Sequence, residues 1–84
     1  MNALIIRIPK AELAFEDNES YHEAAVRMTE GQAIVLGETS RSVYLKINDS
    51  WGRFQEFAQR FHATSPPVEF QQRAQEIKFA GEDG

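Results

Sequence analysis

Cysteine is absent from this 84-residue chain, which excludes a disulfide scaffold and every thiolate metal site. Long apolar runs are missing too, since no run is longer than the four residues from Ala3 to Ile6. A membrane span needs about 20 apolar residues. No Lys or Arg precedes the run and no small-residue cleavage site follows it, so it does not resemble a signal peptide. We therefore expect a cytoplasmic protein with no membrane contact and no cofactor.

Basic residues are missing from residues 11–26, and this absence determines the charge of the protein. The net charge is −4, with 9 Lys and Arg against 13 Asp and Glu. The acidic excess comes from five side chains of that one segment: Glu12, Glu16, Asp17, Glu19 and Glu23. A patch of one sign attracts a partner of the opposite sign, most strongly at low salt. The segment therefore predicts a docking surface for a protein with a basic face.

Catalytic motifs are missing as well. The chain has no Gly-x-Ser-x-Gly sequence, and Gly31 and Gly37 stand alone instead of forming a phosphate-binding loop. The two histidines, His22 and His62, lie far apart in a sequence without cysteine, whereas zinc needs three or four ligands. We expect no catalytic residue and no metal site, and thus a protein that is not an enzyme.

The first half of the chain predicts a strand, a helix and a hairpin. Residues 3–8 are rich in β-branched side chains, and proline at position 9 ends the strand. Ser20 and Glu23 have the spacing of a capping box, and Gly31 is expected to end the helix that follows. Residues 32–48 predict a β-hairpin with a loop at 37–41. Residues 10–17 fit either a strand extension or a helical turn.

The second half predicts two helices. An aromatic stripe at helical spacing follows a cap at Asp49 or Ser50, and it predicts a core-facing helix. The members of the stripe are Trp51, Phe54, Phe57, Ala58 and Phe61. Residues 63–65 break this helix, and the prolines at 66 and 67 begin the last one. Residues 76–80 fit either the end of that helix or a short strand, and residues 81–84 form a frayed tail.

These elements predict a single α+β domain over residues 1–84. It would have two layers, with a three-stranded, mainly antiparallel sheet and two or three helices on one face. The order is strand, helix, strand, strand, helix, helix. The alternative ends in a strand instead of a helix and would be ferredoxin-like in order.

The sheet face turned away from the helices is a second candidate surface. It combines apolar, aromatic and basic side chains, and its candidate contact residues are Ile5, Arg7, Arg41, Tyr44 and Lys46. A mixed face of this kind favours protein contact or self-association, or coverage by the last helix. Nucleic acid ranks third, because a sequence pI of about 5.1 contrasts with the basic footprint of nucleic-acid binders.

The hypothesis is therefore a small protein-binding module. It would act as a stoichiometric inhibitor, immunity factor or adaptor, of the phage or bacterial conflict type. Its acidic patch would cover a basic or catalytic surface of the partner. A structural or regulatory homodimer and a nucleic-acid-binding protein that uses the outer sheet face are the alternatives.

Overall fold

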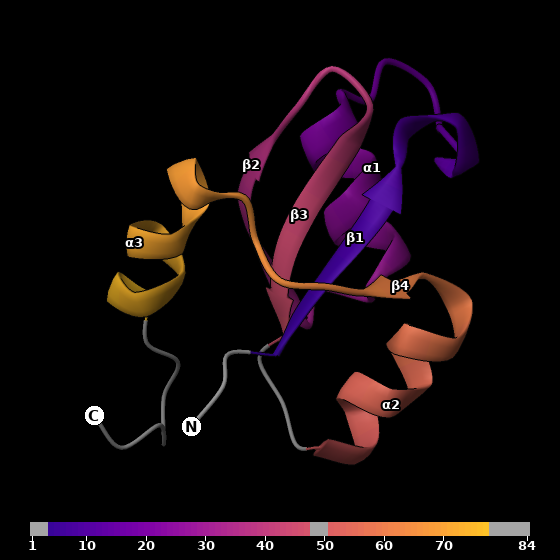
Figure 1. Ribbon diagram of the computed structural model, residues 1–84. Coiled ribbons are helices and arrows are strands. Elements are labelled where there is room, and N and C mark those ends of the chain that lie inside the picture. The colour runs from indigo at the N-terminus through magenta and orange to yellow at the C-terminus, as the bar shows by residue number, and fades with distance from the viewer. Residues whose placement is uncertain (1–3, 48–50, 78–84) are drawn as a thin grey trace.

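The computed structural model describes residues 4–47 and 51–77, with side chains from residue 54 in the second range. In chain order the elements are β1 (Ile5–Pro9), η1 (Lys10–Glu12), α1 (Tyr21–Met28), β2 (Ala33–Glu38), β3 (Ser42–Ile47), α2 (Trp51–Arg60), β4 (His62–Ala63) and α3 (Val68–Glu76). The four described strands form one antiparallel sheet in the order β2-β3-β1-β4 (Figure 1). The α+β class is confirmed. The expectation of three strands is wrong, because β4 adds a fourth.

The main core lies between the sheet and the helices α1 and α2. Strand residues that alternate along the sheet bury their side chains there, together with small residues of α1, Phe57 of α2 and Phe61, which directly follows α2. This core contains Ile6, Ile8, Leu13, Ala24, Ala25, Ala33, Val35, Val43, Leu45, Ile47, Phe57 and Phe61. The predicted aromatic stripe of α2 is confirmed at Phe57 and Phe61, while the side chain of Trp51 lies outside the described residues.

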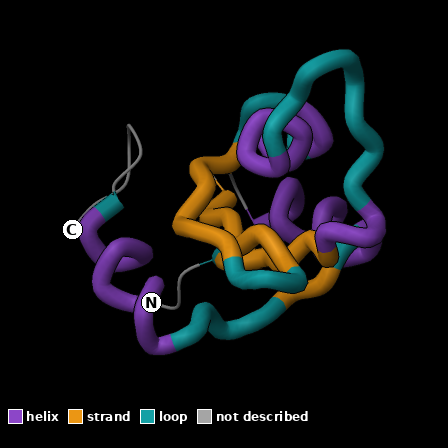
Figure 2. Tube along the Cα trace, turned by 90° about the horizontal axis from the view of Figure 1, so that it is seen from above, coloured by secondary structure: helices purple, strands orange, loops and turns teal. Residues whose placement is uncertain are grey.

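The third helix lies on the opposite face of the sheet. A second, smaller cluster joins Ile5, Leu36 and Ala74, with Tyr44, Phe70 and Ile77 packed against it. In Figure 2 the strands lie between α3 and the other two helices. The expectation that all helices share one face is therefore wrong. The physical reason is that β1 and β2 carry apolar side chains on both faces, with Ile5 and Leu36 turned toward α3, so that both faces need a cover.

The ends of the elements follow local signals. The predicted capping box at Ser20 and Glu23 is confirmed, and α1 ends at Met28. Glu30 donates its N–H to Arg27 and Gly31 donates to Val26, which is the bonding pattern of a Schellman motif. The left-handed residue expected in that motif at Gly31 is instead Glu30, with φ 56°, and Gly31 follows with φ 73°.

Two segments that the sequence left open have definite structures. Residues 10–12 form the 3-10 helix η1, and residues 13–20 form turns and extended chain. Glu76 is the last residue of α3 and Ile77 is its C-cap, so the alternative strand at 76–80 is wrong for these two residues. Residues 78–80 and the predicted tail at 81–84 lie outside the described residues.

Candidate protein-binding surface

The acidic segment is an ordered excursion between β1 and α1. Leu13 anchors it, since its side chain is buried in the main core while its N–H donates to the carbonyl of Lys10. A turn follows in which Glu19 donates to the carbonyl of Glu16. Asn18 occupies the left-handed region with φ 63°, a conformation that asparagine adopts more readily than most residues. The acids of this segment are therefore held by a defined backbone.

One acid of the segment is locked to an arginine just beyond it. Arg27 donates to both carboxylate oxygens of Glu19, each at 2.8 Å, and also to the carbonyl of Ala14. The backbone N–H of Glu16 donates to the same carboxylate at 2.8 Å. The pKa of Glu19 is lowered from 4.5 to about 2. The hydrogen bonds from the Arg27 side chain are the main cause, and the hydrogen bond from the Glu16 N–H is the second. Glu19 thus connects the segment to α1 and has a structural role.

Glu23 also has an internal partner. Its carboxylate accepts the Ser20 N–H at 3.0 Å, while its own N–H donates to the Ser20 hydroxyl at 3.1 Å. The Ser20 N–H is the main cause of a lowered pKa at Glu23. Its position in the first turn of α1 adds a favourable interaction with the helix dipole. Glu23 is exposed, but the cap of α1 explains its presence.

Three acids remain more loosely held. Glu12 lies 3.7 Å from the His62 side chain, an ion pair only when that histidine is protonated. Glu16 approaches Arg27 at 3.6 Å. Asp17 is exposed and forms no ion pair with the residues that the structure describes. These three carboxylates carry the negative charge of the segment that the fold pairs only weakly.

An exposed aromatic pair lies in the same segment. Phe15 is 49% exposed and Tyr21 is 43% exposed, and their rings pack edge to face with centroids 5.4 Å apart. The Lys10 ammonium lies 4.4 Å from the centre of the Tyr21 ring and forms an ion pair with Glu38 at 2.8 Å. We call Glu12, Phe15, Glu16, Asp17 and Tyr21 the 12–21 surface.

Sequence reasoning missed the two aromatics. Tyr21 was not among the contact residues expected from the sequence, yet it is exposed, whereas Ala24 and Ala25 of the same helix are buried. Tyr21 is the first residue of α1, and its ring packs on Phe15 instead of joining the main core. The available signal was the apolar run Leu13-Ala14-Phe15 between Glu12 and Glu16, of which the structure buries only Leu13.

The outer sheet face is covered by α3. Ile5 is buried, and Tyr44 packs against the ring of Phe70 with centroids 5.7 Å apart. Lys46 is 6% exposed and donates to the carbonyls of Ala74 at 3.2 Å and Ile77 at 2.7 Å. Lys46 thus binds the C-terminal carbonyls of α3, where a cation also favours the helix dipole.

The two arginines of that candidate set are more exposed than Ile5 and Lys46. Arg7 is half-buried and donates to the Ser42 hydroxyl at 3.3 Å, whereas Arg41 is exposed. The structure therefore does not bring the five residues together as one open surface. The apolar and basic side chains that suggested a sheet-to-sheet dimer or a nucleic-acid platform are largely used within one chain.

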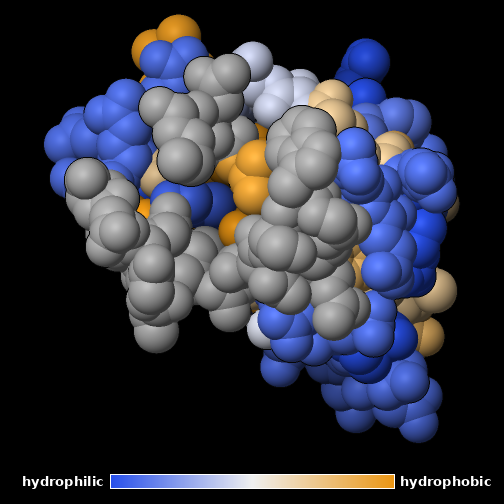
Figure 3. All heavy atoms as spheres, turned by 90° about the horizontal axis from the view of Figure 1, so that it is seen from below, coloured by the Kyte–Doolittle hydropathy of each residue, from blue (hydrophilic) through white to orange (hydrophobic). Residues whose placement is uncertain are grey.

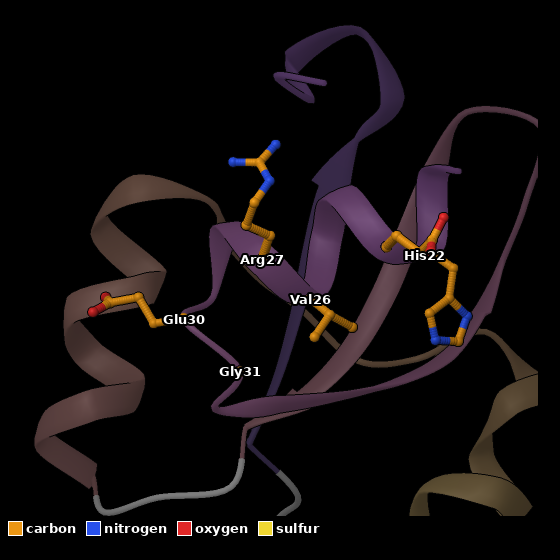
Figure 4. Close-up of a pocket in the computed structure, with 6 residues that line it drawn as sticks. His22, Val26, Arg27, Glu30 and Gly31 are labelled. Carbon is orange, nitrogen blue, oxygen red and sulfur yellow. The ribbon is translucent and has the colours of Figure 1, made fainter. Parts of the chain in front are cut away.

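A shallow depression lies along the outward side of α1. Its volume is about 500 Å³, and Figure 4 shows the residues that line it: His22, Glu23, Val26, Arg27, Glu30 and Gly31. The two histidines are not brought together, since His22 lies here and His62 on β4. Among residues 4–47 and 51–77 no group of three His, Asp or Glu side chains is arranged to hold a metal ion. The depression offers one aliphatic side chain, Val26, and no nucleophile paired with a base.

Hydrophilic residues dominate the face seen from below, with apolar side chains near its middle (Figure 3). None of the described helices has the length and apolar character that a membrane crossing requires. Comparison of the chain with protein-family models, with curated proteins and with solved structures finds no match.

Proposed function

We propose that this protein is a small, non-enzymatic binding module that acts in the cytoplasm by covering a basic surface of a partner protein. Inhibitor, immunity factor and adaptor are the roles compatible with that mechanism. The observation that carries the proposal is the exposed pair of Phe15 and Tyr21, held in an ordered segment beside Glu12, Glu16 and Asp17.

The aromatic pair supports contact with a protein because exposed aromatics of this kind are enriched among binding hot spots. Two rings fixed against each other lose little side-chain entropy on binding. Carboxylates around them would steer a basic partner and set its orientation. The partner's matching patch would then hold an apolar residue flanked by Lys or Arg.

The acids of the segment fall into two groups, those that stabilise the fold and those that a partner could contact. Glu19 and Glu23 satisfy backbone and arginine partners within the fold. Glu12, Glu16 and Asp17 are the more weakly held charges that a partner could contact, and in the chain they flank Phe15 and precede Tyr21. Reversal of Glu19 would disturb the segment itself, so a charge-reversal test should spare it.

The test begins with capture of a partner from the native host on the immobilised full-length chain. The purified partner is then titrated calorimetrically with Phe15→Ala/Tyr21→Ala and with Glu12→Lys/Asp17→Lys. We expect the aromatic variant to weaken binding by about 30-fold or more, as for the loss of a hot spot. The charge variant should weaken binding most at low salt and flatten its salt dependence.

Matched controls come from exposed positions elsewhere. Val68→Ala removes an exposed apolar side chain on α3, and Glu56→Lys reverses an exposed acid on α2. Both controls should bind like the unmodified chain. If the two test variants bind as tightly as the controls, the 12–21 surface is not the contact surface and the proposal fails.

A further inference from the structure

The outer sheet face is built to receive a short helix. Gly37 leaves a notch, because a Cβ there would lie less than 3.0 Å from three atoms of the Phe70 ring. Ala74, one turn further along α3, is small enough to be buried against Ile5 and Leu36. Lys46 then binds the carbonyls at the helix end. The notch at Gly37, the small Ala74 and the cap by Lys46 together fix both the direction in which the helix lies on the sheet and which of its residues face the sheet.

The helix that fills this face is weakly tied to the rest of the chain. Its N-cap, Pro67, forms no side-chain cap, and its remaining side chains are mostly polar and exposed. A nine-residue helix has little stability alone. The link from Thr64 to Pro67 is extended, crosses the sheet from β4 to α3 (Figure 1) and carries two adjacent prolines that keep it stiff. Opening of α3 therefore disrupts only the small cluster around Ala74.

We propose that α3 exchanges between two copies of this chain, giving a dimer in which each sheet holds the partner's α3. Every contact of α3 is kept in the exchange, so its free-energy difference from the monomer is small. Val68 supports a second copy as the occupant. It is 82% exposed at the start of α3, beside the link, where the two links of an exchanged dimer would pass each other and cover it. The proposal does not depend on the 12–21 surface.

Complementation between two full-length variants tests the exchange. Phe70→Ala removes the ring from α3 but leaves the notch at Gly37 open. Gly37→Leu fills the notch but leaves the residues of α3 unchanged. Neither can dock its own α3, but α3 of the Gly37→Leu chain fits the sheet of the Phe70→Ala chain. We expect amide resonances around Gly37 in the isotope-labelled Phe70→Ala chain to shift and saturate on titration to about 1 mM, the effective concentration of short tethers.

The double variant, Gly37→Leu/Phe70→Ala, is the matched control, because its α3 lacks the aromatic ring. It should cause no shift when it is titrated into the Phe70→Ala chain. If the Gly37→Leu chain causes no more shift than this control, exchange does not occur and the proposal is overturned.

A measurement on the unmodified chain guards against a Gly37→Leu chain that fails to fold. We expect refolding at about 1 mM to give a dimer, detected by light scattering. At this concentration, docking of α3 on the sheet of a second copy competes equally with docking on its own sheet. Val68→Glu should reduce the dimer-to-monomer ratio about tenfold by removing a buried valine contact. Gln75→Glu adds the same charge at the far end of α3 and should not. A monomer only, or a dimer that Phe70→Ala forms equally well, overturns the proposal.

Discussion

Replacement of Gly37 by alanine should destabilise the protein, although alanine suits a strand better than glycine does. The Cβ of alanine would lie less than 3.0 Å from three atoms of the Phe70 ring, while ordinary van der Waals contact begins at 3.4 Å. Phe70 cannot move freely, because its ring packs against Tyr44 and its backbone belongs to α3. Overpacking of this kind costs about 1–3 kcal/mol.

A smaller gain opposes this cost. Gly37 does not have a positive φ, so alanine fits its backbone and should add about 0.4–1 kcal/mol by restricting the unfolded chain. The net loss for Gly37→Ala is therefore about 1–2 kcal/mol. A domain of this length has about 4–12 kcal/mol of stability, so the variant should remain folded and measurable.

The decisive measurement is a double-mutant cycle with Phe70→Ala. Half-buried Phe70 should cost about 2 kcal/mol when truncated, roughly half the value for a fully buried phenylalanine. In that background Gly37→Ala has no ring to displace and should be neutral or slightly stabilising. The coupling between the two positions should then be about 1–3 kcal/mol, obtained from urea unfolding followed by circular dichroism.

Gly31→Ala is the matched control for this cycle. Its φ of 73° strains alanine, but no atom lies within 4 Å of the added Cβ. We expect a loss of about 1 kcal/mol from the backbone alone, which Phe70→Ala should leave unchanged. The steric account of Gly37 is refuted if Gly37→Ala is as stable as the unmodified protein, or if it costs as much without the Phe70 ring as with it.

Three further variants test the capping and charged contacts. Glu19→Gln should lower stability at neutral pH, because the pKa of Glu19 is about 2 in the folded protein, below its ordinary value of 4.5. This contribution is present above about pH 4.5 and is lost as the pH falls toward 2, so the urea midpoints of the variant and the unmodified protein should converge in acid. Ser20→Ala removes the side-chain cap of α1 and should cost about 1 kcal/mol by thermal unfolding, whereas Ser40→Ala, at an exposed position, should cost little. Lys46→Met leaves the terminal carbonyls of α3 without their ammonium donor; hydrogen exchange of α3 amides should accelerate about tenfold while that of α1 stays unchanged.

Local signals allowed much of the fold to be predicted from the sequence. The cap at Ser20, the hairpin and the aromatic stripe of α2 each depend on residues a few positions apart. The two-residue strand β4 has no such signal, because two residues show no periodicity. Pairing of His62 with Arg7 on β1 defines it instead, and that contact is non-local.

The position of α3 is the clearest case in which sequence patterns were insufficient. The prolines at 66 and 67 predicted the start of this helix, but no sequence pattern could say which side of the sheet Phe70, Ala74 and Ile77 would meet. Gly37 looked like a turn glycine, whereas its role is to admit the Phe70 ring. Only the fold brings these distant positions together, and it also turns Lys46 from a candidate contact residue into a helix cap.

Ordered residues without a role in the fold are the best guide to function in this chain. The acidic cluster alone was ambiguous, because acids stabilise helix starts and pair with arginines, and Glu19 and Glu23 do so. Phe15 and Tyr21 are different, since each leaves almost half of its area in water although the backbone holds it in place. Exposure of apolar area gives the folded monomer no stability. A rigid aromatic pair beside exposed, weakly paired carboxylates gains that stabilisation only when a partner covers it, which favours the 12–21 surface over the covered sheet face as the site of recognition.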